Sequence, residues 1–186
     1  MEKRWLAMMD QHKNEHIPSP QECIYLLKKM GCSEEVICHC KAVRDVAVRM
    51  AKRTEANLQL VEAGALLHDI GRSKTHGIDH AIEGARIAKK LGLSKEIIGI
   101  IEHHLGAGLS APVAQSLGLP FKEFMPQTLE EKIVCHADNL IDDCTFQPIE
   151  VEIERALQEN HKEYAMQLVS LHKEISEYIG IDANLV

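Results

Sequence analysis

The sequence has few aromatic residues and no long uncharged apolar run. Aromatic side chains make up 4% of the 186 residues, so we expect aliphatic side chains, alanine and methionine to fill the core. The first ten residues lack the apolar segment of a signal peptide, and no stretch approaches the roughly 20 residues that cross a membrane. These absences predict a cytoplasmic protein that does not interact with a membrane.

An excess of positive charge is also absent, because the formal net charge is −7 at pH 7. A protein that binds nucleic acid nonspecifically needs a basic face to neutralise phosphates, so we do not expect that activity. One small phosphorylated substrate in a locally positive pocket remains compatible with this charge. The sequence gives no indication of the oligomeric state.

The six cysteines include no Cys-x-x-Cys pair, which argues against a structural zinc site. Without a secretion signal, we expect them to be free thiols and not a disulfide framework. Cys38 and Cys40 flank His39. Residues two apart on a helix point about 200° away from each other, so these two sulfurs cannot easily share an ion.

The apolar pattern is helical along the chain, and no alternating run of β-branched residues demands a sheet. We therefore expect one compact all-α bundle over residues 1–186. Residues 106–127 are rich in glycine and proline, and are expected to form a long loop with one helical turn near 112–117. Thr128 and Glu131 have the spacing of a capping box. Helix starts are expected at Ser19-Pro20, Ser33, Asn57, Asp79, Ser94 and Thr128, followed by amphipathic helices near 150–159 and 161–179.

Two adjacent pairs, His68-Asp69 and His103-His104, are the most informative feature of the sequence. The first pair ends an apolar helix, where polar side chains are costly to bury unless something coordinates them. Neutral imidazoles bind iron, manganese, zinc and nickel, and a carboxylate can bridge two ions. Helices of a bundle can direct such side chains at one core site. Further candidate ligands on other expected helices are His39, His80 and Asp138.

These seven residues suit two neighbouring metal ions. Asp69 would bridge the ions and help to orient the nucleophile. Two ions can polarise a phosphoryl oxygen and generate a hydroxide. The first ion would be bound by His39, His68, Asp69 and Asp138. The second ion would be bound by Asp69, His80, His103 and His104.

Basic residues near these ligands are candidate contacts for a phosphate group, because a cation beside the transferred group stabilises developing charge. The sequence does not choose among the three candidates, which are Arg44, Arg72 and Lys74. Arg44 lies about 140° around the helix from His39. His76, in the loop after the apolar helix, is a further candidate for substrate contact.

The ordered set His39, His68-Asp69 and Asp138 resembles the HD superfamily of metal-dependent phosphohydrolases, and the run from His68 to Gly71 matches the HDIG form of its signature. The resemblance covers about residues 36–143, with flanking helices at both ends. His80 and the double histidine are similar to those of the binuclear branch, which includes the HD-GYP phosphodiesterases. Leu105-Gly106-Ala107 stands where Gly-Tyr-Pro would follow, so the resemblance does not imply activity on cyclic di-GMP.

The resemblance implies an enzyme that hydrolyses a phosphoester or phosphoanhydride bond through metal-activated water. It implies one or two divalent ions per chain, of iron, manganese, nickel or zinc. The sequence is also similar to small HD proteins that act on diadenosine tetraphosphate or nucleoside monophosphates, so a small nucleotide-like substrate is expected. Two alternatives remain open, namely a metal-binding domain that senses a nucleotide without hydrolysing it, and a di-iron HD oxygenase.

Overall fold

The computed structural model describes residues 16–186, so the N-terminal segment that lacks a signal-peptide pattern lies outside the described residues. The described chain is a helical bundle with one short hairpin, which confirms the expected all-α class. No described helix combines the length and apolar content needed to cross a membrane. The helices are α2 (Pro20–Met30), α3 (Glu34–Ala51), α4 (Leu58–Leu67), α5 (His80–Lys90), α6 (Lys95–His103), α7 (Ala111–Ser116), α8 (Leu129–Asn139), α9 (Ile149–Gln158) and α10 (Lys162–Ile179).

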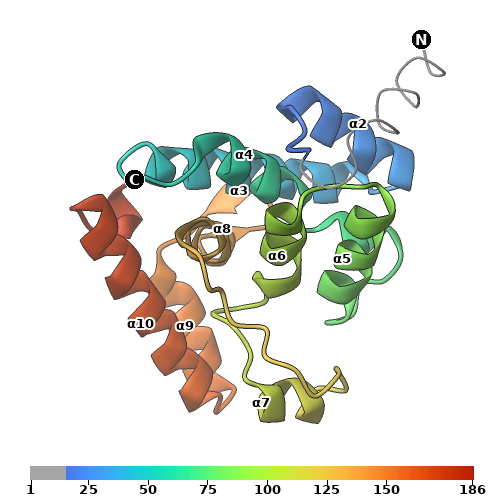
Figure 1. The fold of residues 1–186 in the computed structure, drawn as a ribbon. Coiled ribbons are helices and arrows are strands. Elements are labelled where there is room, and N and C mark those ends of the chain that lie inside the picture. The colour runs from blue at the N-terminus through green and yellow to red at the C-terminus, as the bar shows by residue number, and fades with distance from the viewer. Residues whose placement is uncertain (1–15) are drawn as a thin grey trace, which may run out of the picture.

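Helix α8 lies in the middle of the molecule, with α3, α4 and α6 packed against it (Figure 1). Helices α9 and α10 form a pair that covers α8 from one side, whereas α5 packs on α6. A 3-10 turn, η1 (Ile70–Ser73), follows α4 and packs against α5, and a second, η2 (Ala183–Leu185), packs against α10. The central helices therefore meet where the candidate ligands lie.

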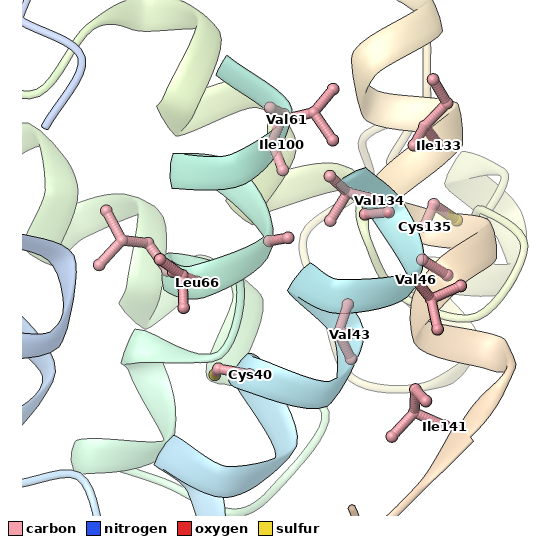
Figure 2. Close-up of a cluster of buried hydrophobic side chains, with 14 of the residues drawn as sticks. Cys40, Val43, Val46, Val61, Leu66, Ile100, Ile133, Val134, Cys135 and Ile141 are labelled. Atoms are coloured by element: carbon pink, nitrogen blue, oxygen red, sulfur yellow. The ribbon is translucent and has the colours of Figure 1, made fainter. Parts of the chain in front are cut away.

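The core is aliphatic, as the scarcity of aromatic residues predicts. Seven of the ten residues of α4 are buried, as its apolar sequence predicts. Figure 2 shows side chains of α3, α4, α6 and α8 meeting in this core, among them Val43, Val61 and Val134. Gly64 of α4 permits the close approach of α6, because a Cβ at this position would lie 2.5 Å from Cδ1 of Ile100.

The helix starts follow the capping residues of the sequence, and Ser19, Ser33 and Thr128 each accept a hydrogen bond from a backbone N–H of the first turn. One detail differs from expectation. Thr128 accepts from the backbone N–H of Glu131 as the spacing predicts, but the shortest bond to the Glu131 carboxylate comes from the backbone N–H of Gln127, at 2.7 Å. The same carboxylate also faces His103 at the end of α6.

A hairpin between α8 and α9 was not predicted. Its strands, β1 (Ile141–Asp142) and β2 (Thr145–Phe146), pair antiparallel, with Ile141 opposite Phe146. Asp143, in the turn, has φ 53°, a left-handed conformation that is uncommon outside glycine. Two residues per strand are too few to produce the alternating pattern that reveals a strand in a sequence.

Candidate metal centre

The end of α4 turns two adjacent side chains toward the same space. His68 keeps helical backbone angles (φ −52°, ψ −38°), whereas Asp69 leaves the helix (φ −98°, ψ 16°). Successive residues of a continuous helix diverge by about 100°, yet Nε2 of His68 lies 3.8 Å from Oδ2 of Asp69. Both side chains are almost completely buried.

Gly71 brings η1 against α5. A Cβ at Gly71 would lie 1.9 Å from the carbonyl oxygen of His80 and 2.6 Å from the backbone nitrogen of Gly84. Only a residue without a Cβ permits this approach. The approach places His80, the first residue of α5, beside Asp69.

The first group of candidate ligands comes from α3, the end of α4 and α8. Oδ1 of Asp138 lies 2.9 Å from Nε2 of His39 and 3.3 Å from Nε2 of His68. Oδ2 of Asp69 lies 3.9 Å and 3.8 Å from the same two nitrogens. Residues from three separate elements thus present two imidazoles and two carboxylates to one small volume.

The second group faces the other oxygen of Asp69. Oδ1 of Asp69 lies 3.1 Å from Nε2 of His80 and 3.6 Å from Nε2 of His104. The two imidazoles come from the start of α5 and from the residue that caps the end of α6. Asp69 therefore faces one group with each oxygen, which is the geometry of a bridging carboxylate.

The four imidazoles of these groups are oriented in the same way, by a hydrogen bond from the ring to the backbone. In each, Nδ1 lies 2.7–2.8 Å from a backbone carbonyl oxygen, which can only accept a hydrogen bond. In the neutral imidazole this bond keeps the proton on Nδ1, so that Nε2 can offer its lone pair to a metal ion. The accepting residues are Asp143 for His39, Ala65 for His68, Gly77 for His80 and Ile101 for His104.

Several polar atoms of the site lack the partner that burial demands. Nε2 of His68 and Oδ1 of Asp69 are buried and accept no hydrogen bond from any described residue. Nε2 of His80 and Nε2 of His104 lie 3.0 Å apart, and both carry a lone pair when both imidazoles are neutral and protonated on Nδ1. Two such lone pairs repel each other unless a cation lies between them. The residues present therefore fit divalent metal ions.

The charge of the site also favours a cation. Burial in itself raises the pKa of Asp69, but the imidazole of His68 and the neighbouring His104 and His80 outweigh it and hold that pKa well below its usual value. Burial likewise raises the pKa of Asp138, yet His68 and His39 lower it further. Both carboxyl groups are thus ionised at neutral pH.

His103 does not join these groups, unlike its neighbour His104. Its Nδ1 lies 3.0 Å from Oε2 of Glu131, and its Nε2 lies 3.8 Å from Oε2 of Glu102. The expectation that both members of this pair contribute ligands therefore does not match the geometry. At the end of α6 the two side chains still diverge, so that one enters the site and the other points to α8.

A cavity of about 970 Å³ opens at the first group, and its lining includes His39, Asp69 and Asp138. Arg72 and His76, both expected to contact substrate, also line it. Nε of Arg72 lies 2.5 Å from Oδ2 of Asp69. The remaining charged residues of the lining are Glu34, Glu35, Asp142, Asp143, Glu152 and Arg155.

Two of the three candidate phosphate contacts lie elsewhere. Arg44 is not among the described residues that line the cavity, and its Nη1 lies 3.2 Å from Oε1 of Glu62. Lys74 is likewise outside the described lining. The structure thus separates Arg72 from Arg44 and Lys74, which the sequence could not do.

Sequence reasoning missed the contribution of the hairpin. The carbonyl of Asp143 orients His39, and Cys144 forms a disulfide with Cys38 across 106 residues of sequence. The disulfide corrects the expectation of six free thiols, because pairing over such a separation cannot be read from cysteine spacing. The other cysteines, Cys23, Cys32, Cys40 and Cys135, are free. One signal was available. Cys38 is next to His39 and Cys144 lies soon after Asp138, and His39 and Asp138 were expected to bind the same ion.

Fold and site together define a helical protein with a buried histidine–aspartate cluster of a kind that can hold metal ions. The sequence model of the HD domain family matches residues 36–142, more than half of the chain, so this chain belongs to the HD domain family. The crystal structure of the HD domain of the L. monocytogenes phosphodiesterase PgpH superposes with a TM-score of 0.54, over 83% of this chain and 97% of that domain. At 20% sequence identity this match shows the shared fold alone.

Two relatives have higher sequence identity. The tRNA (cytidine(56)-2'-O)-methyltransferase of Picrophilus torridus is 42% identical over 167 residues, which are 90% of this chain and 49% of that protein. Uncharacterized protein MJ0778 of Methanocaldococcus jannaschii is 43% identical over 164 residues, which are 86% of this chain and 92% of that protein. The chain thus spans about half the length of the first relative and nearly all of the second.

Proposed function

We propose that the chain is a divalent-metal-dependent hydrolase that cleaves a phosphoester or phosphoanhydride bond in a small, nucleotide-like substrate. The observation that carries the proposal is the position of Asp69, whose two oxygens face two groups of imidazoles. Each of these imidazoles offers Nε2, because a carbonyl oxygen holds the proton on Nδ1. Such a donor set of nitrogen and carboxylate oxygen suits iron, manganese, nickel or zinc.

The residues have separate roles in this proposal. One or two bound ions would polarise a phosphoryl oxygen and supply a water nucleophile at neutral pH. His39, His68 and Asp138 would hold one ion, and His80 and His104 the other, with Asp69 between them. The burial of His68 and His104 excludes bulk water from the inner side of the site, which strengthens every charge interaction within it.

Arg72 is the phosphate contact that the geometry favours. It lines the cavity and is held in place through its Nε on Asp69, so its guanidinium lies beside the carboxylate that faces both groups. A guanidinium in this position would stabilise charge that builds up on the transferred group. His76, on the same cavity lining, would contact the substrate further out.

The volume and the acidic lining of the cavity favour a small substrate over a long polyanion. Its volume of about 970 Å³ lies at the upper end of the range of roughly 300–1,000 Å³ that is typical of small-molecule sites. Glu34 and Glu35 on one side and Asp142 and Asp143 on the hairpin would repel a chain of phosphates. One phosphate at the metal ions, with an uncharged nucleoside portion toward these carboxylates, avoids that repulsion.

The test combines metal analysis with a screen of phosphate substrates. Purified protein is loaded with Mn²⁺ or Zn²⁺ and assayed on nucleoside monophosphates, dinucleoside polyphosphates, cyclic dinucleotides and bis-p-nitrophenyl phosphate. Asp69→Asn should lose metal and reduce hydrolysis by several orders of magnitude while circular dichroism stays helical. Asp45→Asn, the same change at an exposed aspartate of α3, is the matched control and should retain both.

Hydrolysis by Asp69→Asn at the wild-type rate would contradict the mechanism. Binding without turnover of any substrate would favour the nucleotide-sensing alternative, and substrate-dependent oxygen consumption by the iron-loaded protein would favour the oxygenase.

A second candidate function rests on the 42% identity with the methyltransferase of P. torridus over 90% of this chain. Because the match spans 49% of that protein, its methyltransferase activity can reside in the part that this chain does not cover. We propose, as the alternative, that this chain is a module that acts alongside a tRNA methyltransferase. Binding of unmodified tRNA, and stimulation of methyl transfer by a separate methyltransferase, would support it. The absence of both effects would reject it.

A further inference from the structure

We propose that the Cys38–Cys144 disulfide positions His39 for metal binding, and that opening it with a thiol reductant selectively weakens the first metal site. Cys38 immediately precedes His39 on α3, and Cys144 immediately follows Asp143 in the hairpin. The carbonyl oxygen of Asp143 lies 2.7 Å from Nδ1 of His39. The disulfide therefore links α3 to the hairpin directly beside the hydrogen bond between His39 and Asp143.

The orientation of His39 depends on a distant segment of the chain, whereas the orientation of the other candidate histidine ligands depends on nearby backbone. His68, His80 and His104 each donate to a carbonyl three residues earlier in the chain, so local backbone structure orients them. His39 donates to a carbonyl 104 residues away. Its orientation therefore requires that a distant segment be held against α3.

The turn of that segment, which carries Asp143, has few other restraints. Each strand of the hairpin has two residues; Ile141 is buried in the core, but Asp142, Thr145 and Phe146 are exposed. Two-stranded hairpins are marginally stable without further support. Asp143 also holds a positive φ, which a free turn of non-glycine residues rarely adopts. The disulfide is thus the covalent restraint that keeps the carbonyl of Asp143 at His39.

The disulfide is accessible to a reductant, because Cys38 and Cys144 are both exposed and both line the cavity. The other cysteines are less reactive. Burial raises the pKa of Cys23 to about 12 and that of Cys32 to about 11, and thiols of such high pKa carry little thiolate at neutral pH. A redox reagent would therefore act first on the exposed pair.

The reduction is a two-electron exchange. One thiolate of a dithiol attacks a sulfur of the protein disulfide, the S–S bond breaks, and a mixed disulfide forms while the other cysteine leaves as a thiolate. The second thiol of the reductant then displaces the remaining cysteine. Both cysteines end as thiols, and the reductant ends as a cyclic disulfide. Glutathione disulfide reverses the change by the same exchange.

The expected consequence is confined to one half of the site. Loss of the hydrogen-bond partner of a metal-bound histidine typically lowers metal affinity by roughly ten- to a hundredfold, so we expect a drop of that order at the first group. The second group keeps its local carbonyl partners and should keep its affinity. This inference rests on the metal binding proposed above, but it does not depend on which substrate is hydrolysed.

The experiment compares Mn²⁺ binding by the whole chain in two redox states. Metal-free protein is oxidised with glutathione disulfide, or reduced with dithiothreitol and desalted without oxygen, and is then titrated with Mn²⁺ monitored by electron paramagnetic resonance. The step that is missing in Asp138→Asn identifies the first group. That step should weaken on reduction and in Cys38→Ser/Cys144→Ser, and reoxidation should restore it in the wild type alone. Cys32→Ser is the matched control and should respond as the wild type does.

Several results would overturn the inference. Counting of thiols in the denatured, oxidised protein should give four, and a count of six would mean that the pair does not form. Equal affinity in both states would remove the positioning role. Tighter binding on reduction, abolished by Cys38→Ser, would make that thiol a ligand. Failure to bind Mn²⁺ in either state would reject the metal site as well, whereas redox-independent binding would reject this inference alone.

Discussion

Replacing His104 by alanine should remove a metal ion that the same change at His103 leaves bound. The two residues are adjacent at the end of α6, yet only Nε2 of His104 lies near Asp69, at 3.6 Å from Oδ1. His103 is turned to Glu131 of α8. The pair therefore offers a matched comparison in which residue type, helix and position along the chain are almost the same.

The two substitutions should affect different quantities: His104→Ala the metal affinity, and His103→Ala the free energy of unfolding. Removing an outer partner of a metal ligand lowers affinity by roughly ten- to a hundredfold, so removing the ligand itself should cost at least about a hundredfold, or about 2.8 kcal/mol, at the second group. His103→Ala should leave metal affinity unchanged. It should lower the free energy of unfolding by about 0.5–3 kcal/mol, because Glu131 loses one of its partners and keeps the backbone N–H of Gln127.

The assay is metal titration of both variants, followed by elemental analysis after desalting and by urea unfolding of the metal-free proteins. We expect about one equivalent of tightly bound ion in His104→Ala and the wild-type content in His103→Ala. The reasoning would be refuted if His103→Ala lost the second ion, or if His104→Ala bound both ions with unchanged affinity.

Three further changes test other parts of the site. Gly71→Ala should lower the free energy of unfolding by about 1–3 kcal/mol and weaken the second ion, because its Cβ would push the His80 carbonyl away; denaturation and metal titration check this. Glu131→Gln should flatten the loss of stability in acid. Burial raises the pKa of Glu131, but its histidine and backbone partners lower it below 4.5, so the stability it contributes is present above that value and is lost as pH falls through the folded-state pKa. Unfolding at a series of pH values measures it. Arg72→Ala should reduce kcat/KM more than Arg44→Ala, since only the former lines the cavity, and steady-state kinetics decide.

The fold was largely predictable because its information is local. Capping residues such as Ser33 and Thr128 stand directly before helical apolar patterns, and the structure begins helices there. The hairpin could not be found in the same way. Each of its strands is two residues long, and what stabilises it is the contact with α3 and the link to Cys38, which are separated from it by about a hundred residues.

The site was predictable to the level of residue type and order, but not to the level of orientation. His68 and Asp69 converge at the end of α4, whereas His103 and His104 diverge at the end of α6. No pattern in the sequence distinguishes these two cases. Arg44 illustrates the same limit, since its charge fits a phosphate but its contact with Glu62 was invisible.

The way the imidazoles are anchored sets an order in which the centre can be assembled. His80 and His104 acquire their orientation as soon as their own segments fold, because each is tied to a carbonyl three residues back. His39 must wait for a contact that closes 104 residues of chain, and contacts between distant residues form more slowly than local ones. During synthesis or refolding, the second group would therefore be the first to offer oriented ligands to a metal ion. The first group would be completed later, when the hairpin brings the carbonyl of Asp143 to His39.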